Sequence, residues 1–179
     1  MTKVAIRNTP EKTCAGGGAA EGTSRAPFLV LGLGNELLKD DAVGIRVAEK
    51  LQGNVPDGVE VRCTPLFGLS LLDDLIGREK VLLIDSYLPE DLLASEICEI
   101  DLDSLGNSRA PCPHCVGLAE IREIMRSLDL GFPREVRVLA IPVTDPLTFS
   151  ADMSPEVRDR ADYAAEHARR VIREWLITA

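Results

Sequence analysis

Carboxylate side chains stand where apolar stretches of the sequence end. Asp85 directly follows the apolar run of residues 81–84, and Asp40 and Asp41 follow the glycine-containing turn of residues 32–35. In open α/β sheets, ligands gather outside the carboxyl ends of the strands, so carboxylates at such positions are candidate functional groups. A carboxylate at the entrance of a helix can also simply complement the helix dipole. We therefore expect one of Asp40 and Asp41 to cap the following helix and the other to face a site.

A histidine within a cysteine pair offers a different kind of ligand. His114 lies in the sequence Cys-Pro-His-Cys, which begins at Cys112 and ends at Cys115, ahead of a helix predicted from Leu118. Two carboxylates and one imidazole make a plausible open site for zinc or nickel. The other histidine, His167, lies among charged residues of the final predicted helix, where we expect it to be solvated.

The same residues are compatible with two other chemistries. Gly32 and Gly34 begin a G-x-G pattern of the dinucleotide-binding type, but Leu37 takes the place of its third glycine, and acidic neighbours would repel a pyrophosphate. Cys-Pro-His-Cys also occurs in disulfide-generating enzymes of thioredoxin fold, where a helix N-terminus lowers the thiol pKa. In those enzymes the motif follows the first strand, whereas here it lies two-thirds along the chain. A thiol oxidoreductase is therefore the minor alternative to a metal site.

The elements that would position these residues alternate between strands and helices. Apolar or alternating runs predict strands, and apolar residues at spacings of three and four predict helices. The order of these segments predicts a sheet with helices packed on its faces. The predicted strands cover residues 28–31, 59–63, 81–84, 96–100 and 136–141, and the predicted helices cover residues 42–51, 70–76, 118–128 and 155–175.

The connection between the third and fourth predicted strands carries information about the sheet. It is short and contains Pro89, whereas a parallel crossover needs about a dozen residues or more and normally includes a helix. We therefore predict that these two strands are antiparallel neighbours within a mixed sheet of five strands.

Charge and length exclude several functional classes. The chain has 179 residues, which suits one domain, and its 20 basic and 29 acidic residues give a net charge of −9. Affinity for nucleic acid comes from neutralising phosphates, so this balance argues against a nucleic-acid partner and also against an anionic membrane surface. No apolar run reaches the roughly 18 residues of a membrane span. The sequence has no signal-peptide core, and its five scattered cysteines do not indicate a disulfide framework, so we expect a cytoplasmic protein.

The N-terminal residues differ from the rest of the chain. Residues 1–26 are rich in glycine and poor in large apolar residues. Such a segment cannot bury enough apolar area to offset the entropy lost on ordering. We therefore predict a flexible tail over residues 1–26 and a single domain over residues 27–179.

Three motifs occur in a fixed order along the chain. Residues 31–44 run from the glycine turn through the two aspartates, residues 81–85 form an apolar strand that ends in aspartate, and residues 113–118 place a proline–histidine pair ahead of a helix. These motifs resemble the three signatures of the hydrogenase maturation endopeptidases, which trim the large subunit of nickel–iron hydrogenases. The resemblance covers residues 28–176, including the last strand and the last helix.

This resemblance implies a three-layer α/β/α sandwich with a five-stranded twisted mixed sheet. It also implies that Asp41, Asp85 and His114 are the catalytic residues and form a nickel-recognising site of two carboxylates and one histidine. In the family the nickel belongs to the substrate, a large-subunit precursor whose C-terminal extension is removed after nickel insertion, and zinc or cadmium could replace it in isolated protein. The implied protein is a monomer. Cysteines flank His114 here, whereas the family usually has serine before the proline.

The resemblance leaves the chemistry of cleavage open. A metal ion could activate water or polarise the scissile carbonyl, or a carboxylate could act as the general base for water. A protein that senses nickel in a partner without cutting it is the alternative function. A product-release assay on nickel-loaded large subunit separates these two functions.

Overall fold

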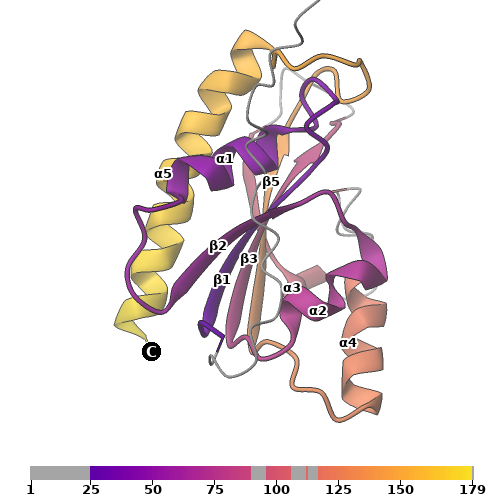
Figure 1. The fold of residues 1–179 in the computed structure, drawn as a ribbon, viewed down its shortest axis with the longest axis vertical. Helices are drawn as coiled ribbons and strands as arrows, with labels where there is room; N and C mark the ends of the chain where they lie inside the picture. The colour runs from indigo at the N-terminus through magenta and orange to yellow at the C-terminus, as the bar shows by residue number, and fades with distance from the viewer. Residues whose placement is uncertain (1–24, 90–95, 106–111, 113–116, 179) are drawn as a thin grey trace, which may run out of the picture.

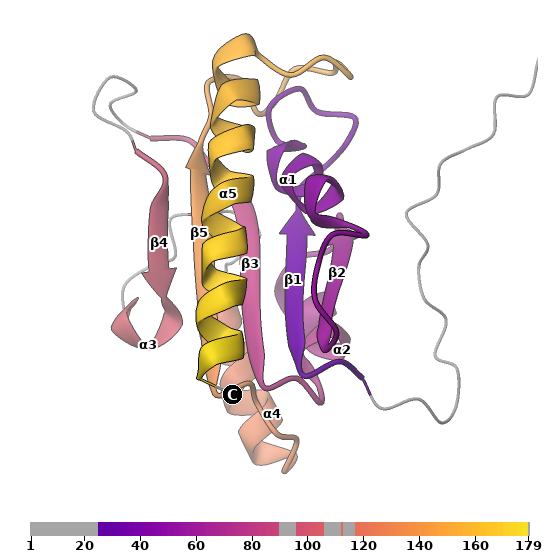
Figure 2. The same ribbon diagram turned by 90° about the vertical axis from the view of Figure 1, so that its left-hand side faces the viewer.

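Five apolar or alternating segments form the strands of one mixed sheet. The computed structural model describes residues 25–89, 96–105, 112 and 117–178. The strand order is β2-β1-β3-β5-β4, in which the first four strands are parallel and β4 is antiparallel to β5 (Figures 1 and 2). The mixed five-stranded sheet is therefore confirmed. The strands are β1 (Phe28–Leu33), β2 (Val59–Thr64), β3 (Lys80–Tyr87), β4 (Cys98–Asp101) and β5 (Glu135–Pro142).

The position of β4 differs from the prediction. β4 runs in the opposite direction to β3, as expected, but it pairs with β5 at the edge of the sheet and not with β3. The reason is that β5 is paired with β3 along all eight residues of both strands, and both strands are largely buried. The four-residue β4 is mostly exposed, which suits a short edge strand.

Helices cover both faces of the sheet. Helices α1 (Val43–Leu51) and α5 (Pro155–Ile177) lie on one face, and α2 (Leu72–Leu75) and α4 (Leu118–Ser127) lie on the other (Figure 2). A 3₁₀ turn, η1 (Gly68–Leu71), precedes α2 and occupies part of the helix predicted over residues 70–76. The predicted helices at α1, α4 and α5 are confirmed to within two residues at each end, and α3 (Leu102–Leu105) is too short for a periodic pattern to predict it.

Alternation along β3 divides the apolar core into two layers. Leu82 and Ile84 pack with α1 and α5, whereas Val81 and Leu83 pack with α2 and α4. The expected three-layer α/β/α sandwich is therefore confirmed. None of the helices in the described ranges is long and apolar enough to cross a membrane.

The predicted N-terminal tail lies mostly outside the described residues, which begin at Arg25. Arg25 donates a hydrogen bond from Nη1 to the carbonyl oxygen of Ile76 (3.1 Å), and the carbonyl oxygen of Ala26 accepts one from Nη1 of Arg78 (2.8 Å). These two residues of the predicted tail therefore contact the domain.

Candidate functional site

The start of α1 is seated directly on the backbone of two central strands. A Cβ atom on Gly44 would lie 2.3 Å from the carbonyl oxygens of both Leu33 in β1 and Ile84 in β3. Real Cβ atoms do not approach backbone this closely, so only glycine allows the helix to lie here. This close approach places Asp41, which lies two residues before the first residue of α1, beside the carboxyl end of β3.

Asp41 is held by hydrogen bonds from two different strand ends. Its side chain is buried, with a residue exposure of 6%. The N–H of Asn35, after β1, donates to Oδ2 (2.9 Å), and the hydroxyl of Ser86, in β3, donates to Oδ1 (2.9 Å). Gly34 has a φ of +144°, and a Cβ there would lie 2.1 Å from the carbonyl oxygen of Asp41, so the turn before the helix also requires glycine.

Asp85 also accepts a hydrogen bond from Ser86, in this case from its backbone N–H. The residue is fully buried, and its Oδ1 accepts a hydrogen bond from the N–H of Ser86 (2.8 Å). The strand β3 continues to Tyr87. Asp85 therefore lies inside the strand, whereas the sequence suggested that it directly follows the strand. Ser86 therefore donates to both Asp41 and Asp85, and the structure brings these two predicted residues to one place near the carboxyl end of β3.

Asp40 has a different role from its neighbour. Its buried carboxylate accepts hydrogen bonds from the N–H and hydroxyl of Ser154 (2.7 and 2.9 Å), the hydroxyl of Thr144 (2.9 Å) and the N–H of Asp145 (2.9 Å). These bonds tie the loop before α1 to the connection between β5 and α5. The two aspartates therefore have different partners, but the expectation that one of them caps the helix is wrong: the N-cap residue of α1 is Ala42, and α1 has no side-chain cap.

The hydrogen bonds to Asp40 set its charge state. Burial raises the pKa of its carboxyl group, but the donors of Ser154, Thr144 and Asp145 together outweigh burial and lower that pKa below the ordinary value. A lowered folded-state pKa stabilises the fold above the unfolded pKa of about 3.9, and this contribution is lost as the pH falls through the folded-state value.

We therefore predict that Asp40→Asn flattens the acid limb of the stability profile. The free energy of unfolding of the wild type should fall between pH 5 and the acid range more steeply than that of the variant, because only the wild type must protonate this buried carboxylate. Urea unfolding at a series of pH values measures the two slopes. Equal slopes would show that Asp40 does not hold the loops through its charge.

The third predicted ligand, His114, and the neighbouring Cys115 lie outside the described residues. Cys112 is described, and it is buried in the apolar layer beneath α4. Burial, together with the nearby thiols of Cys98 and Cys112, raises the pKa of Tyr87 to about 12. Cys112 therefore lies close to Tyr87, two residues beyond Asp85 on the same face of β3. Within the described part of the chain, no group of three or more His, Cys, Asp and Glu side chains could hold a metal ion.

The other histidine does not behave as expected. The side chain of His167 is only 12% exposed, and its Nε2 contacts Oε2 of Glu99 in β4. The expectation that His167 is solvated is therefore wrong, because the edge strand β4 supplies a carboxylate next to α5. This pair is part of the packing between β4 and α5.

Sequence reasoning missed a set of exposed apolar side chains on the loops at this edge of the sheet. The loops that follow β1, β2, β3 and β5, all at the carboxyl ends of parallel strands, expose large apolar side chains, and a backbone bridge between Leu38 and Phe149 joins the first and last of these loops. We call this surface the apolar rim. Its members are Leu37, Leu66, Phe67, Leu69, Leu88, Leu147 and Phe149, with exposures from 45% to 81%.

Ser86 and Gly44 were also missed, although each had a signal in the sequence. Ser86 is a polar residue in a buried strand, directly after Asp85, and Gly44 interrupts an otherwise good helical pattern, where glycine is unfavourable unless a close approach requires it. The fold and these residues together define an α/β sandwich protein with an acidic candidate site at the carboxyl edge of its sheet.

Two known proteins are similar to this chain over most of its length. No family model matches the sequence. The Hydrogenase 2 maturation protease of Escherichia coli (strain K12) is 26% identical over 152 residues, which cover 82% of this chain and 91% of that protein. The hydrogenase expression/formation protein HupD of Bradyrhizobium diazoefficiens is 24% identical over 157 residues, which cover 84% of this chain and 80% of that protein.

The solved structures agree with this similarity. The hydrogenase maturating endopeptidase HybD from E. coli superimposes with a TM-score of 0.70 at 26% identity, covering 82% of this chain and 92% of that one. The chain is a distant homologue of the hydrogenase maturation protease family over most of its length, as the resemblance of the motifs predicted.

Proposed function

We propose that the protein is an endopeptidase that removes the C-terminal extension of a nickel–iron hydrogenase large-subunit precursor after nickel insertion. Asp41, Asp85 and His114 recognise the nickel that the substrate carries. The observation that carries this proposal is the position of Asp41 and Asp85, both of which accept hydrogen bonds from Ser86, in a chain related to proteases of this kind. The protein is a monomer, and it processes its substrate in the cytoplasm.

The donor set suits a borderline metal ion. Each carboxylate oxygen has two lone pairs, and the two oxygens of Asp41 each accept one hydrogen bond from Asn35 or Ser86. A lone pair on each of these oxygens is thus compatible with a metal bond. Cys112 supports the assignment of His114, because it precedes that residue by two positions and is buried near Tyr87 on the Asp85 face of the sheet.

The metal contact provides a means of checking the substrate. If Asp41, Asp85 and His114 bind the nickel of the precursor, the scissile bond is oriented for attack only in metal-loaded substrate, because binding at the metal fixes the approach of the peptide. Two routes to hydrolysis fit this arrangement. The substrate's nickel could activate water or polarise the carbonyl, or one of the aspartates could take the proton of the attacking water.

The apolar rim supports a folded protein as the substrate. Contiguous exposed apolar patches on soluble proteins mark surfaces that contact partners. The apolar rim lies on the loops at the carboxyl edge of the sheet, the same edge at which Asp41 and Asp85 lie. A large-subunit precursor could cover it while presenting its nickel to Asp41 and Asp85.

The test is a processing assay on purified large-subunit precursor with and without nickel. We predict that the wild type shortens only the nickel-loaded precursor, as seen by gel mobility and by mass spectrometry of the released peptide. His114→Ala should lose this activity, because the site then lacks one of its three ligands. Asp162→Asn, which removes a carboxylate 66% exposed on α5, is the matched control.

Each alternative gives a different result in the same assay. A non-cleaving nickel sensor would bind the loaded precursor without releasing a peptide. A thiol oxidoreductase would depend on the cysteines, so a Cys112→Ala, Cys115→Ser double variant that keeps full processing excludes it. Alanine is the better choice at Cys112, because that residue is buried among apolar side chains and a serine hydroxyl there would lack a polar environment.

A further inference from the structure

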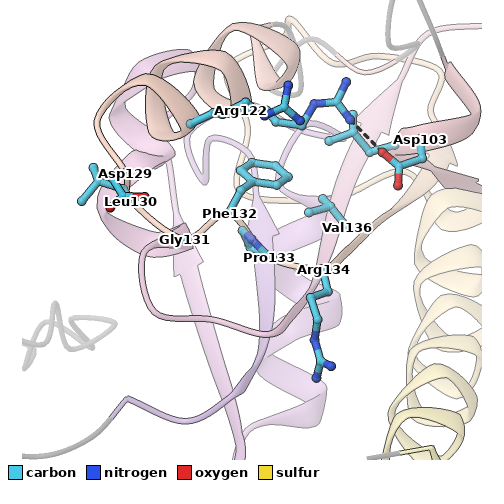
Figure 3. A pocket seen from close by; sticks show the side chains of 11 residues that line it. Asp103, Arg122, Asp129, Leu130, Gly131, Phe132, Pro133, Arg134 and Val136 are labelled. Atoms are coloured by element: carbon cyan, nitrogen blue, oxygen red, sulfur yellow. Dashed lines mark hydrogen bonds and ion pairs between the residues drawn. The ribbon is translucent and has the colours of Figure 1, made fainter.

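A pocket lies at the opposite end of the sheet from Asp41 and Asp85. It is open to solvent, has a volume of about 460 Å³ and is lined by residues of α4, the loop from α4 to β5, and the start of α3 (Figure 3). Val136, one of its lining residues, pairs with Val81 at the beginning of β3, four residues before Asp85. The volume falls within the range of small-molecule sites. This pocket is therefore separate from the candidate peptidase site.

Two arginines of α4 line this pocket. Arg122 and Arg126 are four residues apart, so they lie on the same side of the helix. Nη1 of Arg122 donates to Oδ1 of Asp103 (2.7 Å), whose side chain is 77% exposed, and Arg126 pairs with Glu123, where both side chains are more than 60% exposed. Such exposed ion pairs contribute little, so both guanidinium groups can bind another anion.

One donor of Arg122, beside the pocket, has no partner among the described residues. Nε of Arg122 is buried and makes no hydrogen bond within the described residues. Buried donors are almost always paired, and one left without a partner is unfavourable. Because Nε itself is buried, an anion in the pocket would contact the outer nitrogens of this guanidinium group and compensate its charge next to the unpaired donor.

Besides the carboxylates of Asp103 and Asp129, the lining near these arginines contains apolar side chains. The ring of Phe132 lies beside the side chain of Arg122, and Val136 lies next to it, whereas Arg134 turns away from the ring (Figure 3). The guanidinium of Arg134 pairs with Glu79. The pocket therefore combines cationic groups from α4 with an apolar wall from the loop before β5.

We propose that this pocket binds a small organic anion. Its carboxylate or phosphate group binds the guanidinium groups of Arg122 and Arg126, and its aromatic or branched apolar part packs on Phe132 and Val136. The planar guanidinium fork matches two-oxygen anions of this kind. Because the whole chain carries a net charge of −9, attraction of an anion to this place depends on the local arginines and not on the overall charge.

The experiment is a titration of the full-length protein followed by amide chemical shifts. The probes are phenylphosphate, phenylacetate, inorganic phosphate and the neutral 2-phenylethanol. We expect saturable shifts confined to α4 and residues 129–136 with the two phenyl anions, and binding about tenfold weaker for inorganic phosphate and for 2-phenylethanol, since each lacks one half of the interaction. The tighter of the two phenyl anions identifies the preferred anionic group.

Three variants connect the shifts to the pocket. Arg122→Gln and Arg126→Gln should each weaken phenyl-anion binding by about tenfold, the effect of losing a charge-assisted hydrogen bond. Arg158→Gln, which changes an exposed arginine at the far end of the molecule on α5, should leave binding unchanged. Arg126 is exposed, so its variant keeps the test valid if Arg122→Gln does not fold.

Two results would overturn the proposal. One is the absence of saturable shifts in the pocket residues at millimolar concentrations of both phenyl anions. The other is equal binding by the wild type and by both pocket variants, which would place the anion elsewhere on the protein.

Discussion

Asp85→Asn should reduce cleavage of the nickel-loaded precursor by at least about 100-fold while the protein stays folded, since positioned acid–base and charge effects typically contribute this much or more. Asparagine has the shape of aspartate and keeps an oxygen that can accept the hydrogen bond from the N–H of Ser86. It lacks the negative charge, so it binds a divalent metal more weakly and cannot act as a base. The measurement is the initial rate of peptide release, with circular dichroism and thermal unfolding of each variant.

A matched control separates the role of this carboxylate from a general loss of negative charge. Asp162→Asn removes the same charge from an exposed position of α5 and should process the precursor at the wild-type rate. Asp41→Asn should behave like Asp85→Asn, because both carboxylates meet at Ser86. A folded Asp85→Asn variant that cleaves as fast as the wild type would remove Asp85 from the proposed site.

Most of the sheet could be predicted because its signals are local. Buried parallel strands are continuous apolar runs, and residues 81–84 and 138–141 are such runs. The neighbour of β4 could not be predicted in the same way. The length of a connection indicates whether two strands can be parallel. It does not indicate which strand pairs with β3, because β4 and β5 compete for that position. The longer and more buried β5 occupies it.

The candidate site was predictable in part. The positions of Asp41 and Asp85 next to strand and helix ends indicated a shared location, and the structure brings both to Ser86. The different roles of Asp40 and Asp41 were not predictable, because the partners of Asp40 in the connection from β5 to α5 are more than 100 residues away in the sequence. The exposure of the apolar rim was also hidden, since composition does not distinguish a buried phenylalanine from an exposed one.

Gly44→Ala should destabilise the protein by about 1–3 kcal/mol, the usual cost of inserting an extra methyl group into a well-packed core. Alanine in a helix is ordinarily more favourable than glycine by roughly 0.5–1 kcal/mol, so the expected sign is the reverse of the intrinsic preference. The cause is that the added Cβ would lie 2.3 Å from the carbonyl oxygens of Leu33 and Ile84. Those oxygens belong to β1 and β3, which are paired on both sides, so α1 must move instead.

The displacement of α1 should also impair processing. Val47 and Leu51 of α1 are fully buried, so movement of the helix opens the core, and it draws Asp41 away from Ser86. Urea unfolding measures the free energy of unfolding, and the processing assay measures the site. Gly131→Ala is the control, because a Cβ there would meet nothing within 4 Å and its φ is not in the left-handed region. A Gly44→Ala protein as stable and as active as the wild type would show that the helix is not seated on the strands, and the pairing of Asp41 with Asp85 through Ser86 would lose its structural basis.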